Sequence, residues 1–212
     1  MSYVTMKNEH PIQKELKQVV PTKELQRAIK NVRVFDDTRV IKLSEKPSNV
    51  PMLIRKGDCL RSLGIDKKMC LLDFASDSNP GGGWRSKQQG TQEEHLCRNS
   101  SLGITLESCN KYPINTYGAL FVETCYVLAP KTKQKLSCTV IVAALRQGDK
   151  NYIEQKTEGI LKVAVANGVQ NLIVGAWGCG AFGNEVDDVV SGWNKAISKF
   201  GGYFDQIVFA IR

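Results

Sequence analysis

The run MCLLDFA at 69–75 constrains the fold more than any other segment of this chain. It is apolar for almost its whole length and stops at the glycine-rich stretch SDSNPGGG. Such a run is typical of a strand covered on both faces, as strands are in parallel sheets flanked by helices. A central sheet is therefore expected, with further apolar strands at 118–128, 137–145, 171–177 and 205–211.

Helical patterns separate these strands. Helices are predicted from Thr91, over 152–168 and over 185–200. The second helix closes at Gly168, and its buried side is expected to carry Ile160, Leu161, Val163 and Ala164. The alternation predicts an α/β fold, a three-layer α/β/α sandwich with a mixed, mostly parallel central sheet. Ligands of such sheets bind beyond the carboxyl ends of the strands.

The N-terminal part of the chain has two further helical patterns. One begins at Pro11 and covers 11–20, and the other follows Thr22, whose hydroxyl is expected to cap its exposed amides. We expect both helices to brace the sheet. The short apolar runs RVIKL at 39–43 and PMLIR at 51–55 are predicted to be strands, because the loop-like SEKPSN separates them.

Length and composition exclude several classes of protein. A chain of 212 residues suits one domain, and no apolar run approaches the roughly 20 residues that cross a bilayer. The first ten residues lack the apolar stretch of a signal peptide. Seven scattered cysteines and two histidines give neither a disulfide framework nor zinc spacing. We expect an intracellular, cytoplasmic protein with reduced thiols; a nuclear or virus-encoded protein also fits.

The formal net charge of +8 favours contact with polyanions. Nucleic acid and a phosphate-rich substrate both meet that description. The basic residues are spread along the chain without a basic arm or interleaved aromatic residues, a pattern that favours a solvated basic surface. Charge alone leaves these three interpretations open.

Two glycine loops follow predicted strands and precede predicted helices. Loop one, residues 79–83, reads NPGGG, and loop two, residues 178–184, reads GCGAFGN. Glycines expose backbone N–H groups with no side chain to obstruct a phosphate, and a helix amino terminus favours negative charge. Two such loops can hold one diphosphate, although each can also be a tight turn. Phe182 is either a platform for a ribose or adenine, or a plug for the core.

The acidic pair Glu93-Glu94 lies at the predicted start of the helix after loop one. A carboxyl group beside a glycosidic oxygen can donate a proton and then take one from attacking water. The alternative is structural, because Thr91-x-x-Glu94 matches a capping box and acidic residues are favoured in a first helical turn. The residues alone leave both roles open.

Taken together, NPGGGWRSKQQGTQEEHLCRNSSL at 79–102 resembles the signature of poly(ADP-ribose) glycohydrolases of the microbial macrodomain type, in which a triple glycine precedes Gln-Glu-Glu. GAWGCGAFGN at 175–184 resembles the family's second phosphate loop, and FDQIVFAI at 204–211 resembles its final strand. The likeness extends from about Leu53 to Ile211. It implies one macrodomain-like catalytic domain over 1–212, with 1–50 as a helical extension packed on it.

The resemblance also implies roles for individual residues. Glu94 would be the catalytic acid/base, Glu93 would hold ribose hydroxyls and Gln92 would support the loop. Phe182 would orient the distal ribose, and Asp58 would lie near the adenine. Arg85 and Lys87 would reach a phosphate of a neighbouring unit. No metal and no cofactor are expected. The diphosphate would be gripped by Gly81, Gly82, Gly83, Gly178, Gly180, Ala181 and Gly183.

The leading hypothesis is hydrolysis of the ribose–ribose O-glycosidic bond of poly(ADP-ribose), releasing ADP-ribose. The partners would be ADP-ribose and poly(ADP-ribose) on modified proteins, with no membrane, and with nucleic acid only as a modified target. We expect a monomer. Two alternatives share the pocket: a non-catalytic ADP-ribose reader, and a hydrolase of single ADP-ribose groups. A nucleic-acid-binding protein whose glycine loops are only turns is the remaining alternative.

Overall fold

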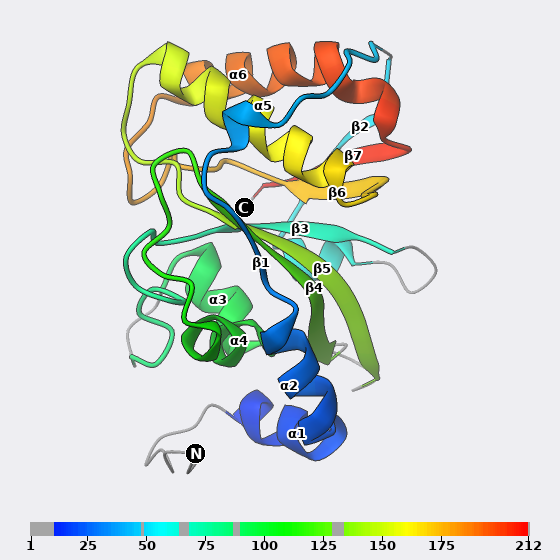
Figure 1. Cartoon of the computed structure of the whole chain (residues 1–212), viewed down its shortest axis with the longest axis vertical. Coiled ribbons are helices and arrows are strands. Elements are labelled where there is room, and N and C mark those ends of the chain that lie inside the picture. The colour runs from blue at the N-terminus through cyan, green and yellow to red at the C-terminus, as the bar shows by residue number, and fades with distance from the viewer. Residues whose placement is uncertain (1–10, 48, 64–67, 87–89, 129–133, 212) are drawn as a thin grey trace.

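The architecture is a seven-stranded sheet in the order β1-β4-β5-β3-β6-β7-β2 (Figure 1). The computed structural model describes residues 11–47, 49–63, 68–86, 90–128 and 134–211. Neighbouring strands are parallel from β5 through β3, β6 and β7 to β2, whereas β4 runs antiparallel to β5 and β1 antiparallel to β4. The mixed, mostly parallel sheet is confirmed. The strands are β1 Arg33–Phe35, β2 Met52–Lys56, β3 Cys70–Phe74, β4 Ala119–Leu128, β5 Lys135–Ala143, β6 Asn171–Val174 and β7 Gln206–Ile211.

Helices cover both faces of the sheet, which confirms the three-layer sandwich. In Figure 1, α5 (Lys150–Ala166) and α6 (Val186–Phe200) lie above the sheet, and α3 (Gln92–Arg98) and α4 (Leu102–Cys109) lie below it. Each side has its own apolar core. The predicted helices at 152–168 and 185–200 are α5 and α6, and Gly168 follows α5 with a φ of +69°.

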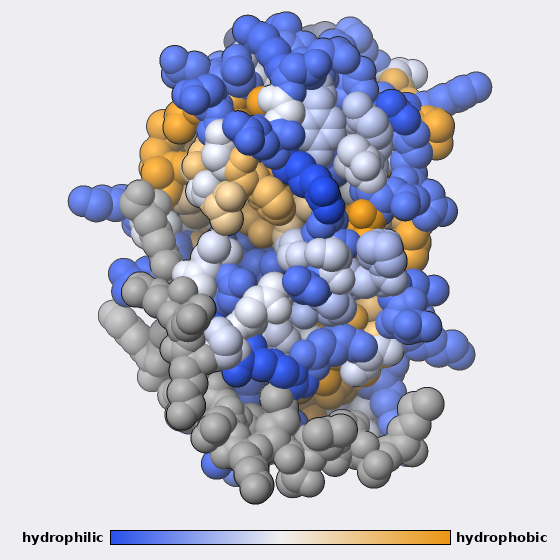
Figure 2. Space-filling model, turned by 90° about the vertical axis from the view of Figure 1, so that its left-hand side faces the viewer, coloured by the Kyte–Doolittle hydropathy of each residue, from blue (hydrophilic) through white to orange (hydrophobic). Residues whose placement is uncertain are grey.

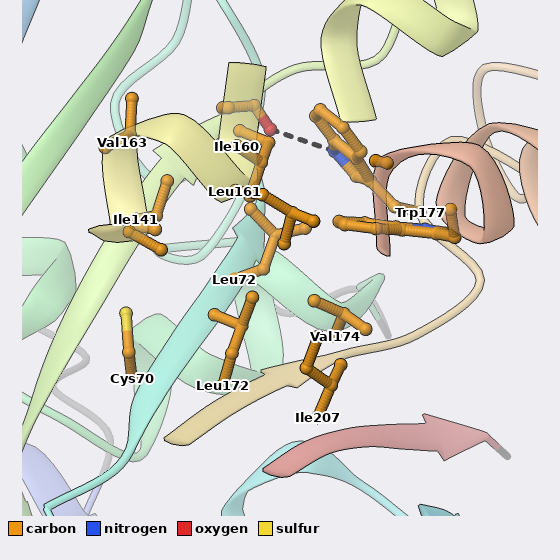
Figure 3. Packing of buried hydrophobic residues seen from close by; sticks show 14 of the residues in the cluster. Cys70, Leu72, Ile141, Ile160, Leu161, Val163, Leu172, Val174, Trp177 and Ile207 are labelled. Atoms are coloured by element: carbon orange, nitrogen blue, oxygen red, sulfur yellow. Dashed lines mark hydrogen bonds between the residues drawn. The ribbon is translucent and has the colours of Figure 1, made fainter. Parts of the chain in front are cut away.

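β3 contributes to both cores because its side chains alternate. Cys70 and Leu72 pack with the α5 and α6 side, and Leu71 packs on the α3 and α4 side. Figure 3 shows Leu72 beside Leu161 of α5, whose apolar side is buried as predicted. Fully burying a leucine stabilises the fold by about 1.5–3 kcal/mol. This double coverage explains why the run at 69–75 is almost entirely apolar.

The two N-terminal helices are confirmed as α1 (Pro11–Val19) and α2 (Thr22–Lys30). They pack on the sheet through a small apolar cluster that includes Leu128 of β4. The predicted cap of α2 is wrong. Pro21 precedes the helix without a side-chain hydrogen bond, and Thr22 is already a helical residue. Threonine caps from outside the first turn, a position that proline occupies here.

The predicted strand at 39–43 is also wrong. Residues Thr38–Val40 form a short 3₁₀ helix, and the strand of this region is β1, which ends before it at Phe35. The Asp37 side chain accepts a hydrogen bond from Arg39 N–H, which favours a turn over an extended chain. Thr38 is buried against α5, where a Cβ on Gly159 would lie 2.1 Å from its Oγ1. The predicted strand at 51–55 is β2.

The connections after β3, β5 and β6 all leave the same edge of the sheet, on the left in Figure 1. This edge carries both glycine loops, because loop one follows β3 and loop two follows β6. Figure 2 shows it face-on, with hydrophilic residues around an apolar patch in the upper half. Of the helices in the described parts of the chain, none is long and apolar enough to cross a membrane.

Candidate active site

The connection from β3 to α3 makes a tight glycine turn. Gly82 N–H donates to the Asn79 carbonyl at 2.9 Å, and Trp84 N–H donates to the Gly81 carbonyl at 3.1 Å. Gly81 and Gly82 have φ angles of +75° and +57°, in the left-handed region that favours glycine. The backbone of loop one therefore requires glycine at these two positions.

Gly82 lies directly against two glutamates at the start of α3. A Cβ on Gly82 would lie 2.4 Å from Glu94 Oε1 and 2.7 Å from Glu93 Oε2. No side chain fits there without moving a carboxyl group. The triple glycine and the Gln-Glu-Glu segment, which are apart in sequence, therefore form one packed unit.

Trp84 anchors this turn to α4. It is buried, and its Nε1–H donates to Glu107 Oε1 at 3.0 Å. Arg85 pairs with the same glutamate, and its guanidinium carbon lies 4.3 Å from the centre of the Trp84 ring. Arg85 is thus engaged within the protein, and its predicted phosphate contact stays a prediction. Lys87 lies outside the described residues.

The Glu94 carboxylate is held by three donors. Gly83 N–H donates to Oε1 at 2.9 Å, while Thr91 N–H and Thr91 Oγ1–H donate to Oε2 at 2.6 and 2.7 Å. Partial burial opposes ionisation, but the bonds from Gly83 and Thr91 outweigh it and lower the pKa of Glu94. Glu94 closes a capping box with Thr91, and it faces loop one at the same time. Glu94 therefore caps the helix, and its carboxylate also lies where the predicted acid/base role would need it.

Glu93 has the opposite electrostatic character. Its side chain is buried, Oε2 accepts a bond from Ser76 N–H at 2.8 Å, and Oε1 has no hydrogen-bond partner among the described residues. Burial, opposed in part by the Ser76 bond and reinforced by Glu94, raises the pKa of Glu93 to about 8. Near neutral pH the pair therefore holds one proton, on Glu93, beside an ionised Glu94.

Asp73, near the end of β3, is a site residue that sequence analysis missed. Its side chain is completely buried, and neither carboxyl oxygen has a hydrogen-bond partner among the described residues. Burial and the nearby charge of Glu93 raise its pKa well above the usual range. Asp73 is therefore a neutral acid behind Glu93. The only signal in the sequence was an acidic residue inside an otherwise apolar strand.

Gln92 binds the backbone of β3. Its side-chain oxygen accepts from Phe74 N–H at 3.0 Å, and its amide donates to the Leu72 carbonyl at 2.9 Å. β6 pairs with β3 only at Cys70 and Leu71, so the backbone groups of Leu72 and Phe74 have no partner in β6. Gln92 takes the place of that partner. Gln92 thus fixes the start of α3 to the end of β3 at the point where the sheet opens.

Loop two is closed by a buried asparagine that was not among the predicted site residues. Asn184 Nδ2–H donates to the carbonyls of Leu145 and Gly178 at 3.1 and 3.0 Å, and Gly148 N–H donates to Asn184 Oδ1 at 3.2 Å. Gly178 has a φ of +77°, and a Cβ there would lie 2.7 Å from Asn184 Nδ2. Asn184 therefore ties loop two to the β5–α5 connection.

The two loops are joined through that same connection. Arg146, which follows β5, pairs with Asp77, two residues before loop one. Asn184 Nδ2–H also donates to the Arg146 carbonyl at 3.2 Å. One residue thus contacts both loop two and the segment that enters loop one, so the predicted phosphate loops lie side by side at one edge of the sheet.

The tip of loop two is open. A Cβ on Gly180 or Gly183 would meet no atom within 4 Å, Ala181 is exposed and Phe182 is half-buried. The space beside the glycines suits close approach by a ligand. Phosphate contact by this tip and ribose contact by Phe182 stay predictions.

Asp58 has a structural role in the free protein. It accepts a bond from Arg61 N–H at 3.1 Å at the start of a short 3₁₀ helix, and one of its oxygens lies 3.9 Å from His95 Nε2 of α3. The structure thus brings Asp58 beside α3, and adenine contact stays a prediction. Within the described ranges, no group of three or more His, Cys, Asp or Glu residues is placed to hold a metal ion.

Comparison with known proteins identifies relatives of this arrangement. The family model described as microbial-type PARG, catalytic domain, matches residues 3–131, which include loop one and the Gln-Glu-Glu segment. No curated protein sequence matches the chain.

Solved structures share the fold. The poly(ADP-ribose) glycohydrolase of Thermomonospora curvata has a TM-score of 0.74 at 19% identity, over 89% of this chain and 82% of that one. The enzyme of Deinococcus radiodurans in complex with ADP-ribose has a TM-score of 0.73 at 20% identity, over 91% of this chain and 92% of that one. These likenesses confirm the macrodomain-like fold predicted from the sequence.

Proposed function

This chain belongs to the family of microbial-type PARG catalytic domains, glycosidases that act on poly(ADP-ribose), and we propose that it hydrolyses the ribose–ribose O-glycosidic bond and releases ADP-ribose. One observation carries the proposal. The Glu94 carboxylate packs against the backbone of the triple glycine, with Gly83 N–H 2.9 Å from Oε1. The carboxyl group of Glu94, which can exchange a proton, thus lies beside loop one, whose glycines suit a diphosphate.

Binding would place the diphosphate against the backbone of both loops, where the glycines leave room for it. Gly81, Gly82 and Gly83 would approach one side of the diphosphate, and Gly178, Gly180, Ala181 and Gly183 the other. The links from Asn184 and Asp77 to the β5–α5 connection support this geometry, because they keep the two loops together before a ligand arrives. A preorganised site loses less conformational entropy on binding.

The proton needed for cleavage is already present in the free site. Glu93 is protonated near neutral pH, and Glu94 is ionised. A sugar that covers Glu94 would exclude water, and the nearby diphosphate would add negative charge, so both effects raise the pKa of Glu94. The proton of Glu93 can then move onto Glu94, whose raised pKa now favours it.

Glu94 would then act as general acid and as general base in turn. It would donate its proton to the oxygen of the departing ribose as the glycosidic bond breaks, which leaves an oxocarbenium-like sugar. Water would attack that carbon, and Glu94 would take the proton that the water releases. Glu93 would hold ribose hydroxyls, and Phe182 would orient the distal ribose. One water is consumed, and both products end in hydroxyl groups.

The test uses the wild-type protein with purified poly(ADP-ribose) and with a protein that carries single ADP-ribose groups. We expect ADP-ribose to be released from the polymer. ADP-ribose at 100 times its dissociation constant should also add about 2.7 kcal/mol to the free energy of unfolding. Release from the mono-modified protein alone would make the chain a mono-ADP-ribosyl hydrolase. No stabilisation by ADP-ribose would contradict any role for this pocket.

A reader of ADP-ribose is the second candidate, and one observation favours it. Both oxygens of the Glu94 carboxylate are occupied by donors of the helix cap and loop one. If substrate binding leaves these bonds in place, Glu94 has no proton to give. Tight ADP-ribose binding without product release over long incubation would establish the reader.

A further inference from the structure

Lys156 is a buried lysine that neither the fold nor the proposed mechanism accounts for. It lies on α5 and is 2% exposed. Its Nζ donates to the Gly118 carbonyl at 3.3 Å and lies 5.6 Å from the centre of the Trp177 ring. Within the part of the chain that the structure describes, its ammonium group has no ion-pair partner.

The groups around Lys156 belong to the edge of the sheet that carries the loops. Gly118 comes just before β4, which begins at that edge, and Trp177 immediately precedes loop two. Trp177 is itself fixed, because its Nε1–H donates to the Ala143 carbonyl at 3.0 Å (Figure 3). Asp77, which enters loop one, is the carboxylate whose charge acts on Lys156. The ammonium thus lies beneath the place where the two loops meet.

An unpaired ammonium in this position disfavours folding. Transfer of a charge from water into the interior is costly unless a partner compensates it, and a well-packed apolar side chain of similar volume is often more stable. Burial accordingly lowers the pKa of Lys156 to about 8. A methionine at this position would pack equally well without the cost of a buried charge. The presence of the charge therefore needs an explanation other than packing.

We propose that Lys156 supplies a resident positive charge for the diphosphate of bound ADP-ribose, acting through space from beneath loops one and two. This inference rests on the proposed function, because it assigns a ligand to the same site. Charges interact more strongly in the protein interior than in water, so an ammonium that does not touch the ligand still favours a diphosphate dianion. Lys156 would therefore be a residue for affinity, not for the chemical step.

The proposal predicts a coupling between ligand binding and protonation. A bound dianion stabilises the charged lysine, so binding raises the pKa of Lys156 above its value in the free protein. Affinity should be full below pH 8 and fall as the pH rises through 8, where the free protein loses the charge. In that range each bound ADP-ribose should bring a fraction of a proton with it.

Of the other titratable groups, Tyr152 and Cys179 do not titrate in this range. Burial raises the pKa of Tyr152, on the same helix, above 10.0 and that of Cys179, in loop two, above 9.0. Glu93 also titrates near pH 8. Several charged groups on and around α5 are in ion pairs, namely Asp77 with Arg146, Asp37 with Arg39, Glu154 with Lys195 and Glu158 with Lys199.

The experiment is calorimetric titration of ADP-ribose between pH 6.5 and 9.5, in pairs of buffers with different ionisation enthalpies. It compares wild type with Lys156→Met and with Lys30→Met, which removes the same charge from exposed α2. At pH 7 we expect Lys156→Met to bind about tenfold more weakly, the size of a through-space charge effect. Lys30→Met should bind like wild type. Glu93 is present in all three proteins, so the difference between their pH profiles isolates Lys156.

Thermal melting separates an electrostatic role from a structural one. Lys156→Met should melt at a higher temperature than wild type, because it removes a buried charge, and yet bind ADP-ribose less tightly. A lower melting temperature with an unchanged proton uptake would mean that Lys156 is structural, and would overturn the proposal. Equal affinity and equal pH dependence in the two proteins would also overturn it.

Two further measurements keep the proposal testable on folded protein. Proton uptake on binding at pH 8.5 should be larger in wild type than in Lys156→Met, and equal uptake in the two proteins would contradict the proposal. Lys156→Arg keeps the charge at all these pH values, so it should bind tightly without the fall above pH 8. If wild type bound no ADP-ribose at any pH, the proposed function would be refuted. If wild type and Lys156→Met bound ADP-ribose equally well, only the role of Lys156 would be refuted.

Discussion

Gly82 and Glu94 are packed so closely that a methyl group on Gly82 would lie 2.4 Å from Glu94 Oε1. The glycine turn and the helix start thus cannot change independently. This contact explains why a loop suited to phosphate and a carboxyl suited to acid/base chemistry occur together in the sequence. It also makes the loop a direct determinant of where the carboxyl points.

Gly82→Ala should abolish most of the activity. The substitution places Cβ against Glu93 and Glu94 and strains a φ of +57°, at a cost of about 1–3 kcal/mol for the strain alone. Turnover on poly(ADP-ribose) and the melting temperature measure the two effects. Gly168→Ala is the matched control, because its φ of +69° imposes similar strain with no atom within 4 Å. Equal loss of turnover in both variants would contradict a specific role for the Gly82 contact.

The pH dependence of kcat/KM should have an alkaline limb. The carboxyl pair needs one proton, and Glu93 holds it with a pKa of about 8 in the free protein. Since a free-enzyme group that must be protonated loses its function as the pH rises through its pKa, kcat/KM should fall above pH 8. Glu93→Gln should move that limb to lower pH, because the proton must then be carried by Glu94, whose pKa is lowered. A profile flat to pH 9.5 in wild type would show that the proton on Glu93 is not used.

Asp73→Asn should stabilise the fold at neutral pH. The folded pKa of Asp73 is raised, so between pH 4 and that value the folded state binds more protons than the unfolded state, and wild-type stability falls as the pH rises. Asparagine removes this loss. We expect a gain of more than about 1 kcal/mol at pH 7.5 and almost none at pH 4. Urea unfolding at the two pH values measures it; a gain that is equal at both would contradict a neutral buried acid.

Asn184→Ala should loosen loop two. The variant loses the bonds from Asn184 to Leu145 and Gly178, and a buried group left without its partner costs about 1–3 kcal/mol. Weaker ADP-ribose binding should accompany the lower stability, because the loop is no longer preorganised. Asn167→Ala, at the end of α5 and far from the loops, removes a single bond to Val163 and serves as the control. Unchanged affinity for ADP-ribose in Asn184→Ala would show that the hydrogen bonds of Asn184 do not contribute to ligand binding.

The fold was predictable where an apolar run, typical of a strand buried on both faces, ends at residues typical of a loop. The apolar run ending in glycine gave β3 and loop one, and Gly168 marked the end of α5. The segment at 39–43 was wrongly predicted as a strand because it contains apolar, β-branched residues. The local hydrogen bond from Arg39 N–H to Asp37 favours a 3₁₀ turn instead. β1 was missed because three residues, with Arg33 and Val34 exposed, carry almost no periodic signal.

The position of the two glutamates beside loop one was predictable, but their electrostatics were not. The motif predicted both glutamates, yet only the fold shows that Glu94 is ionised by donors from Gly83 and Thr91, while Glu93 is buried and protonated. Asp73 and Asn184 escaped notice for a related reason. A buried polar residue is identified by its surroundings, which come from parts of the chain distant in sequence.

The cap and the proposed chemistry of Glu94 can be separated with Thr91→Ala. That variant loses the hydroxyl donor and about 1 kcal/mol of stability, as N-cap substitutions do, but keeps the carboxyl group. We expect most of the turnover to remain. A loss as large as that of a Glu94 variant would indicate that helix capping, and not the carboxyl group, sustains activity.

Glu94→Gln is the sharpest test of Glu94 as the acid/base group, because glutamine keeps the shape of the side chain and cannot carry the proton. The measurement is turnover of poly(ADP-ribose) and affinity for ADP-ribose on the same preparation. We expect turnover to fall by about 100-fold or more, the range for loss of acid/base catalysis, while ADP-ribose still binds. Turnover equal to that of wild type in a variant that binds ADP-ribose would contradict this role of Glu94.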